Sequence, residues 1–176
     1  MMGEVSMSNL RAREALERAH DLFLQRPSAG LKPNPWASAV WRDGLQCEIM
    51  GPSGEKAVTD MPAAMGGDGS GPNPGWLLRA SMAACSATAI AMQAAQRGIE
   101  LKVLEVKVES ESDARGLVGI DGVSTALGKL RMSIAIAADN VGEEALRDLA
   151  RSGEALSPVS CTLRDGPRVA CEVTVL

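Results

Sequence analysis

The spacing of apolar and polar residues changes along this chain, and each change marks an expected element of structure. Apolar residues recur every three or four positions in 8–24 and in 143–153, which predicts two amphipathic helices. Elsewhere apolar and polar residues alternate, which predicts strands with one buried and one wetter face. Strands are expected at 36–41, 45–50, 104–108, 130–136 and 169–175. The order of these elements predicts an α+β domain in which helices back an antiparallel sheet.

One further helix is expected to be buried at the centre of the fold. Asn73 can cap its first turn, Pro74 suits the first helical position, and Gly98 ends it. Its uncharged stretch, Ala80–Gln96, is rich in Ala, Ser and Thr and is slightly short for a membrane span. A helix that is apolar or small on every face must be surrounded by protein. We therefore expect this helix at the centre of a domain or of a dimer.

Segments rich in proline and glycine indicate how the chain is organised. Residues 27–35 are rich in Pro and Gly and are typical of a linker. Residues 1–35 are therefore expected to form an N-terminal helix with its linker, and 36–176 the main domain. Two long loops are expected within that domain, at 62–74 and 110–128. Loops of this length are often functional.

Composition and charge exclude several classes of function. The formal net charge is −4, with 18 Lys and Arg against 22 Asp and Glu, and aromatic residues make up 2% of the chain. No nucleic-acid partner is expected, because such binding needs clustered basic residues and often aromatic stacking. The single histidine, His20, excludes sites that need two imidazoles from one chain, and we expect neither a metal nor a bound cofactor. The N-terminus has no basic stretch before an apolar run, so we expect a cytoplasmic protein without a membrane partner.

The four cysteines carry the candidate chemistry. Cys47 and Cys171 are in phase with the apolar faces of their expected strands, which favours core thiols. Cys85 lies about three turns into the long helix, beyond the first turn in which the helix dipole acts on a thiol. A reactive Cys85 therefore needs a cation from elsewhere in the fold, and a core role stays open. Cys161 lies about one turn into a short helix expected from residue 157 onward.

Two sequence motifs stand at the start of the long helix and near the C-terminus. Residues 71–85, GPNPGWLLRASMAAC, begin that helix with Asn-Pro and carry Ala-Ala-Cys within it, and GIEL follows at 98–101. A Pro-Val-Ser element stands at 158–160. Over residues 36–176 the chain resembles the OsmC/Ohr superfamily of osmotically induced and organic-hydroperoxide-resistance proteins. The resemblance implies an intertwined homodimer with the two long helices at its centre and two symmetric sites at the subunit interface.

The resemblance also implies an activity and its site residues. In the peroxidase members, a cysteine of the long helix attacks an organic hydroperoxide, and an Arg from the first strand turn and a Glu at the start of the long helix activate it. A second Cys directly before the Pro-x-Ser element then closes a disulfide that dithiols reduce. Cys85 stands at the attacking position and Arg42, in Arg42-Asp43-Gly44, at that of the activating Arg. Gly75 stands at the Glu position and Ser157 at that of the second cysteine.

Cys161 is the stand-in for that second cysteine, four residues beyond Ser157. Four helical residues correspond to a shift of about 6 Å along the helix axis. The Cα atoms of a disulfide lie roughly 4.4–6.8 Å apart, so pairing of Cys85 with Cys161 stays open. Without that pairing, Cys85 would act as a one-cysteine enzyme that an external thiol restores.

Three functions therefore compete. The leading hypothesis is a cytoplasmic homodimer that reduces organic hydroperoxides, with Cys85 as thiolate, Arg42 as its cation, Cys161 as resolving thiol and an external dithiol as reductant. The alternative is a non-catalytic dimer of the same fold that binds a small hydrophobic ligand at the subunit interface. The third is a structural dimer that docks a partner through the helix at 8–24.

Overall fold

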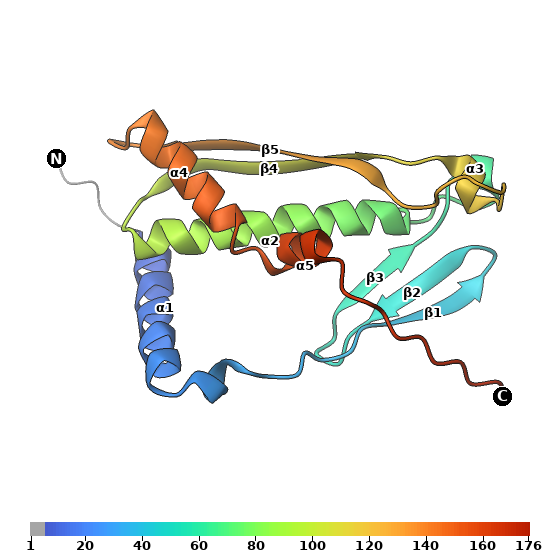
Figure 1. Cartoon of the computed structure of the whole chain (residues 1–176), viewed down its shortest axis with the longest axis horizontal. Helices are drawn as coiled ribbons and strands as arrows, with labels where there is room; N and C mark the ends of the chain where they lie inside the picture. Colours follow the sequence, from blue (N-terminus) through green and yellow to red (C-terminus); the bar gives the residue numbers. More distant parts are fainter. Residues whose placement is uncertain (1–5) are drawn as a thin grey trace. The chain divides into compact units, whose positions relative to one another are not determined.

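The computed structural model describes residues 6–176, and its elements are those of an α+β protein (Figure 1). The helices are α1 (Met7–Gln25), α2 (Pro74–Gln96), α3 (Ala114–Leu117), α4 (Glu143–Glu154) and α5 (Pro158–Asp165). The strands are β1 (Ser38–Asp43), β2 (Gln46–Met50), β3 (Lys56–Thr59), β4 (Leu101–Glu111) and β5 (Gly128–Ala138). Short 3-10 helices occupy Pro27–Gly30 and Ala63–Met65. Every expected helix and all but one of the expected strands are present.

The described chain forms two compact units. Unit 1 contains the described residues up to Leu16 together with Ser81–Lys107 and Met132–Leu176, and unit 2 contains Glu17–Ala80 and Val108–Arg131. Helices α1 and α2 and strands β4 and β5 each contribute residues to both units. The expected division into 1–35 and 36–176 stays a prediction.

Unit 1 holds the hydrophobic core, in which α2 and α4 pack against strands β4 and β5. Ile90 of α2 and Leu149 of α4 are fully buried at its centre. Helix α4 keeps its expected period, because Leu146, Ala150 and Gly153 are buried with Leu149. At Gly153 an added Cβ would lie only 2.6 Å from the Cα of Ile90. The close approach of the two helices therefore requires glycine at this position.

Strands β4 and β5 pair with each other as a two-stranded sheet. Lys102 near the start of β4 pairs with Asp139 just beyond the end of β5, at 3.2 Å. Lys129 at the start of β5 pairs with Glu111 at the end of β4, at 2.7 Å. These ion pairs join opposite ends of the strands, as an antiparallel arrangement requires. Half-buried and exposed residues alternate along most of both strands, which confirms the expected wetter face.

Unit 2 contains the antiparallel sheet β1-β2-β3. Cys47 of β2 lies in register with Trp41 of β1 on one side and with Thr59 of β3 on the other. Gly44 allows the tight turn between β1 and β2 because its φ is +51°, and the indole Nε1 of Trp41 donates a hydrogen bond to its carbonyl oxygen at 2.9 Å. Strand β3 was not expected, since its four residues are too few to show an alternating pattern.

Helix α2 begins as the sequence predicts. The Oδ1 atom of Asn73 accepts a hydrogen bond from the backbone N–H of Trp76 at 2.9 Å, and Pro74 is the first helical residue. The chain covers Ser86, Ile90 and Ala94 completely or nearly so, whereas Trp76 and Met92 remain 49% and 42% exposed. A single chain therefore does not surround this helix on every side. Among the described helices, none combines the length and apolar character needed to cross a membrane.

The expected C-terminal strand at 169–175 is wrong. Residues 166–176 carry no regular structure, and Val169, Val173 and Val175 are 90%, 82% and 88% exposed. Cys171 is exposed with them, so it is not the core thiol that its alternation predicted. Alternation fixes which residues share a face, but a strand forms only where a neighbouring strand supplies hydrogen bonds. No strand of the described residues pairs with this segment.

Candidate functional site

Cys85 lies on the wall of an apolar cavity of about 410 Å³ in unit 1. Helix α2 forms much of the wall, because Cys85, Thr88, Met92 and Gln96 follow a three- and four-residue spacing and share one helical face. The other lining residues are Ala89, Gln93, Leu156 and Pro158. Cys85 is a free, half-buried thiol. The cavity therefore offers a reactive atom beside a hydrophobic space.

The surroundings of Cys85 suit an organic molecule better than a thiolate. Among the described residues that line the cavity, none carries a charged side chain. Its polar groups are the hydroxyl of Thr88 and the amides of Gln93 and Gln96. A cysteine becomes strongly nucleophilic when a cation or a hydrogen-bond donor stabilises its thiolate. Such a cation has to come from outside this lining.

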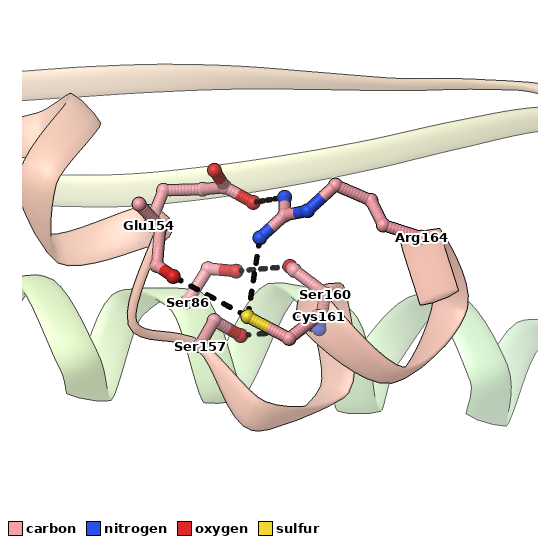
Figure 2. A network of polar contacts seen from close by, with 7 residues as sticks. Ser86, Glu154, Ser157, Ser160, Cys161 and Arg164 are labelled. Carbon is pink, nitrogen blue, oxygen red and sulfur yellow. Dashed lines mark hydrogen bonds and ion pairs between the residues drawn. The ribbon is translucent and has the colours of Figure 1, made fainter. Parts of the chain in front are cut away.

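Buried hydroxyl groups fasten α5 to α2 (Figure 2). Ser157 caps α5, since its Oγ accepts a hydrogen bond from the backbone N–H of Ser160 at 3.4 Å. The Oγ atoms of Ser86 and Ser160 lie 3.1 Å apart, and both residues are fully buried. Ser86 directly follows Cys85, and Ser160 directly precedes Cys161. The structure therefore joins the two helices next to both candidate thiols.

Cys161 has a polar environment that the sequence did not indicate (Figure 2). Its thiol donates a hydrogen bond to the carbonyl oxygen of Ala155, and Nη2 of Arg164 donates one to its Sγ, both at 3.3 Å. Nη1 of Arg164 also binds Oε1 of Glu154 at 2.8 Å. The hydrogen bond to Glu154, followed by the contact with Cys161, raises the pKa of Arg164 above its usual value. Cys161 thus contacts a guanidinium that a carboxylate holds in place.

Arg42 lies in unit 2, at the end of β1, and its partner there is Glu48 of β2. Its Nε donates a hydrogen bond to Oε2 of Glu48 at 2.8 Å, and its Nη2 forms a second contact with the same oxygen. The hydrogen bonds from Arg42 lower the pKa of Glu48 below its ordinary value. The side chain of Arg42 is half exposed and fixed across the hairpin.

Gly75, at the position where the resemblance expects a Glu, borders a second cavity of about 390 Å³ in unit 2. Met61, Leu117 and Leu127 also line this cavity. An added Cβ at Gly75 would lie 3.7 Å from Nη1 of Arg79, and this Nη1 donates a hydrogen bond to Oγ of Ser110 at 3.1 Å. With glycine at this position, Arg79 pairs with a hydroxyl instead of a carboxylate from residue 75.

Asp60 is a buried acidic residue that binds a loop of unit 2, a role that was not expected from the sequence. Asp60 is only 2% exposed. Its carboxylate accepts hydrogen bonds from the backbone N–H groups of Met61, Asp68 and Ser70 and from the hydroxyl of Ser70, at 2.7–3.1 Å. These bonds, with the backbone of Ser70 first, lower the pKa of Asp60. They fold the glycine-rich loop around one buried charge. The sequence signal that could have revealed this role is an acidic residue ahead of a glycine-rich loop.

The remaining cysteines and the histidine have less distinctive surroundings. Cys47 is half-buried in β2, and Cys171 is exposed in the C-terminal segment. His20 is exposed on α1, with its Nδ1 3.4 Å from a carboxylate oxygen of Asp21. Within residues 6–176, no group of three or more His, Cys, Asp or Glu side chains is arranged to hold a metal ion.

Comparisons with known proteins agree with this fold. A family model described as OsmC-like protein matches residues 67–172. A search of curated proteins finds no match. An OsmC-like protein from Mycoplasma pneumoniae is 16% identical, with a TM-score of 0.64 over 76% of this chain and 89% of that one.

Two further solved structures are similar to this chain. An organic hydroperoxide resistance protein from Legionella pneumophila is 21% identical, with a TM-score of 0.54 over 76% of this chain and 91% of that one. The organic hydroperoxide resistance protein OhrB of Bacillus subtilis is 22% identical, with a TM-score of 0.51 over 75% of this chain and 91% of that one. At these identities the likeness establishes the fold.

Proposed function

Because this chain belongs to the OsmC-like protein family, we propose that it is a thiol-dependent reductase of organic hydroperoxides with Cys85 as the attacking thiol. The observation that carries this proposal is the free thiol of Cys85 on the wall of an apolar cavity of about 410 Å³. Two structurally similar proteins are named organic hydroperoxide resistance proteins, which supports the same substrate class. Met92 and Leu156 in the lining would contact the organic group of the hydroperoxide.

The reaction at Cys85 is a displacement on oxygen. The thiolate attacks the peroxide oxygen farther from the organic group, a sulfur–oxygen bond forms, and the oxygen–oxygen bond breaks. The alkoxide leaves and takes up a proton to become the alcohol. Cys85 is oxidised to the sulfenic acid, and the hydroperoxide is reduced.

Arg42 is the cation that we propose for Cys85, on the strength of its place in the resemblance. The structure holds Arg42 through Glu48, so the carboxylate that orients this arginine comes from β2. At the start of α2, where the resemblance expects that carboxylate, stands Gly75. Glu48 would thus orient Arg42 in place of the glutamate that the resemblance expects at position 75.

Cys161 is the proposed resolving thiol, and an external dithiol would reduce the resulting disulfide. Support comes from the segment that joins α4 to α5. The carbonyl of Ala155 contacts the sulfur of Cys161, while Leu156 and Pro158 line the cavity of Cys85. A bond between the two sulfur atoms would require Cys161 to leave that carbonyl. The contact between Ser86 and Ser160 would hold α2 and α5 together during this movement.

We further propose that the active form is a cytoplasmic homodimer. Apolar side chains on α2 and in the C-terminal segment are exposed in the single chain, among them Met92, Val173 and Val175. A second copy would cover this apolar surface and supply a neighbour for the segment that alternates without pairing.

The test is to treat the reduced full-length protein with one equivalent of cumene hydroperoxide and to measure intact mass before and after blocking free thiols. Loss of two thiols mapping to Cys85 and Cys161 is the expected result. One added oxygen on Cys85 alone would retain the reductase but assign resolution to an external thiol. No change at Cys85 over minutes would refute the proposed reaction.

The second candidate is non-catalytic binding of a small hydrophobic ligand in the same fold. It is favoured by the uncharged lining of the Cys85 cavity, which suits an apolar molecule without activating a thiol. Saturable binding of a hydrophobic fluorescent probe that Cys85→Ser leaves unchanged, together with an unoxidised Cys85 in the mass experiment, would favour this function.

A further inference from the structure

We propose that Arg164, oriented by Glu154, is a positioning residue that stabilises the thiolate of Cys161 for its attack on oxidised Cys85. The inference rests on the proposed function and adds a residue to its second step. Nη2 of Arg164 lies 3.3 Å from Sγ of Cys161, and Nη1 lies 2.8 Å from the carboxylate of Glu154. The guanidinium bridges a carboxylate and a sulfur, and the carboxylate fixes the direction in which it donates (Figure 2).

Two neighbours of the sulfur act in opposite directions. The carbonyl oxygen of Ala155 accepts the thiol proton and so favours the neutral form of Cys161. Arg164 donates to the sulfur and favours the thiolate. A hydrogen bond between charged groups is about twice as strong as a neutral one, so the contact with Arg164 becomes stronger when Cys161 loses its proton. Glu154 alone would oppose the thiolate, but its charge is engaged by Arg164.

Loss of the proton also frees the sulfur to move. A thiolate has no hydrogen to donate, so it gives up its bond to Ala155 while keeping its contact with Arg164. The nearby side chains of Ser86 on α2 and Ser160 on α5 are neutral and hydrogen-bonded to each other (Figure 2). Deprotonation therefore activates Cys161 and releases it from the segment that joins α4 to α5.

The resolving step is balanced without a further reactant. The thiolate of Cys161 attacks the sulfur of the Cys85 sulfenic acid, a sulfur–sulfur bond forms, and the sulfur–oxygen bond breaks. Hydroxide leaves and is protonated by solvent. Cys161 is oxidised, and the sulfur of Cys85 is reduced from the sulfenic to the disulfide state.

The first test measures thiolate formation at Cys161 without any peroxide. Full-length reduced protein is labelled briefly with iodoacetamide at pH 7 and at pH 10, and labelling is quantified by peptide mass spectrometry. Cys47, a free thiol in β2 that is half-buried as Cys161 is, is the internal reference. Arg164→Gln is expected to lower the labelling of Cys161 relative to Cys47 about fivefold at pH 7, with a much smaller effect at pH 10, which lies above the ordinary pKa of a thiol.

Three further variants separate charge from structure. Arg164→Lys should restore part of the labelling, because it keeps a positive charge but loses the forked donor. Glu154→Gln should lower the labelling by a smaller factor, because it leaves Arg164 less well oriented. Arg147→Gln is the matched control, since that arginine pairs with Glu143 on α4. Labelling within twofold of wild type in Arg164→Gln, or an equal loss at both pH values, would overturn the proposal.

The second test follows a single turnover. After one equivalent of cumene hydroperoxide, Arg164→Gln should oxidise Cys85 at the wild-type rate, but its sulfenic acid should persist for dimedone trapping while the disulfide forms several-fold more slowly. An unchanged rate of disulfide formation would overturn the role of Arg164. If wild-type Cys85 is not oxidised at all, the proposed function fails, and the labelling ratios still report separately on Arg164.

Discussion

Cys85 and Cys161 are both half-buried free thiols on helices of unit 1, yet their neighbours differ in kind. Cys85 borders an apolar cavity whose lining carries no charge among the described residues. Cys161 contacts the ion pair between Arg164 and Glu154. In the proposed function these surroundings serve different steps, since one thiol has room for an organic substrate and the other has electrostatic support. Its consequences can be tested one at a time.

The largest expected effect comes from removing the thiol beside the cavity. Cys85→Ser should abolish consumption of cumene hydroperoxide, because the hydroxyl is far less nucleophilic than a thiolate. Cys47→Ser is the matched control, since Cys47 is also half-buried but lies in β2 of unit 2. Peroxide loss monitored by a ferrous-iron dye assay measures the outcome. Wild-type turnover in the Cys85 variant would show that Cys85 is not the thiol that attacks the hydroperoxide.

The second largest effect is expected from filling the apolar cavity beside Cys85. Thr88→Phe would place a ring in the cavity and should lower kcat/KM for cumene hydroperoxide about tenfold, while the smaller hydrogen peroxide is affected much less. Ala91→Phe is the control, because Ala91 is exposed on the same helix and does not line the cavity. Equal losses for both peroxides would show that the cavity does not select the organic group.

A smaller effect is expected at the contact that joins the two helices. Ser86→Ala leaves the buried hydroxyl of Ser160 without this partner and should lower the free energy of unfolding by about 1–3 kcal/mol. The double variant with Ser160→Ala should recover part of that loss, because no orphaned hydroxyl remains. Urea unfolding of both variants measures the difference. Additive losses would argue against a direct hydroxyl contact.

The smallest effect concerns pH and lies away from both thiols. Hydrogen bonds lower the pKa of Asp60 in the folded state, so its contribution to stability is present above the unfolded pKa of about 3.9 and is lost as pH falls from there through the lower pKa of the folded state. Asp60→Asn should therefore lower the melting temperature at pH 7 and flatten its decline between about pH 5 and pH 3. Asp121→Asn, at an exposed position, should change neither.

The sequence predicted those parts of the fold that local physics determines. The period of α4 and the Asn73-Pro74 start of α2 were read correctly, because caps and amphipathic faces act within one or two turns. The strand at 169–175 was not, because its alternating valines needed a neighbour that no pattern within the segment could reveal.

The candidate site was predictable only in part for the same reason. A motif marked Cys85 by resemblance, but the cavity beside it also needs Leu156 and Pro158, far away in the sequence. Arg164 follows Cys161 by three residues, and that spacing on a helix could have suggested their contact. The orienting role of Glu154 depends on how α4 meets α5, and the buried charge of Asp60 depends on the path of a loop.

The uncovered C-terminal segment has a consequence for handling the protein. Its exposed, alternating valines lie outside both sheets of the described residues, and such segments promote cross-β association between chains, above all when the protein is partly unfolded. If a second copy covers this segment, thermal resistance will rise with protein concentration by mass action. The C-terminal segment would then link the concentration of the protein to its lifetime at high temperature.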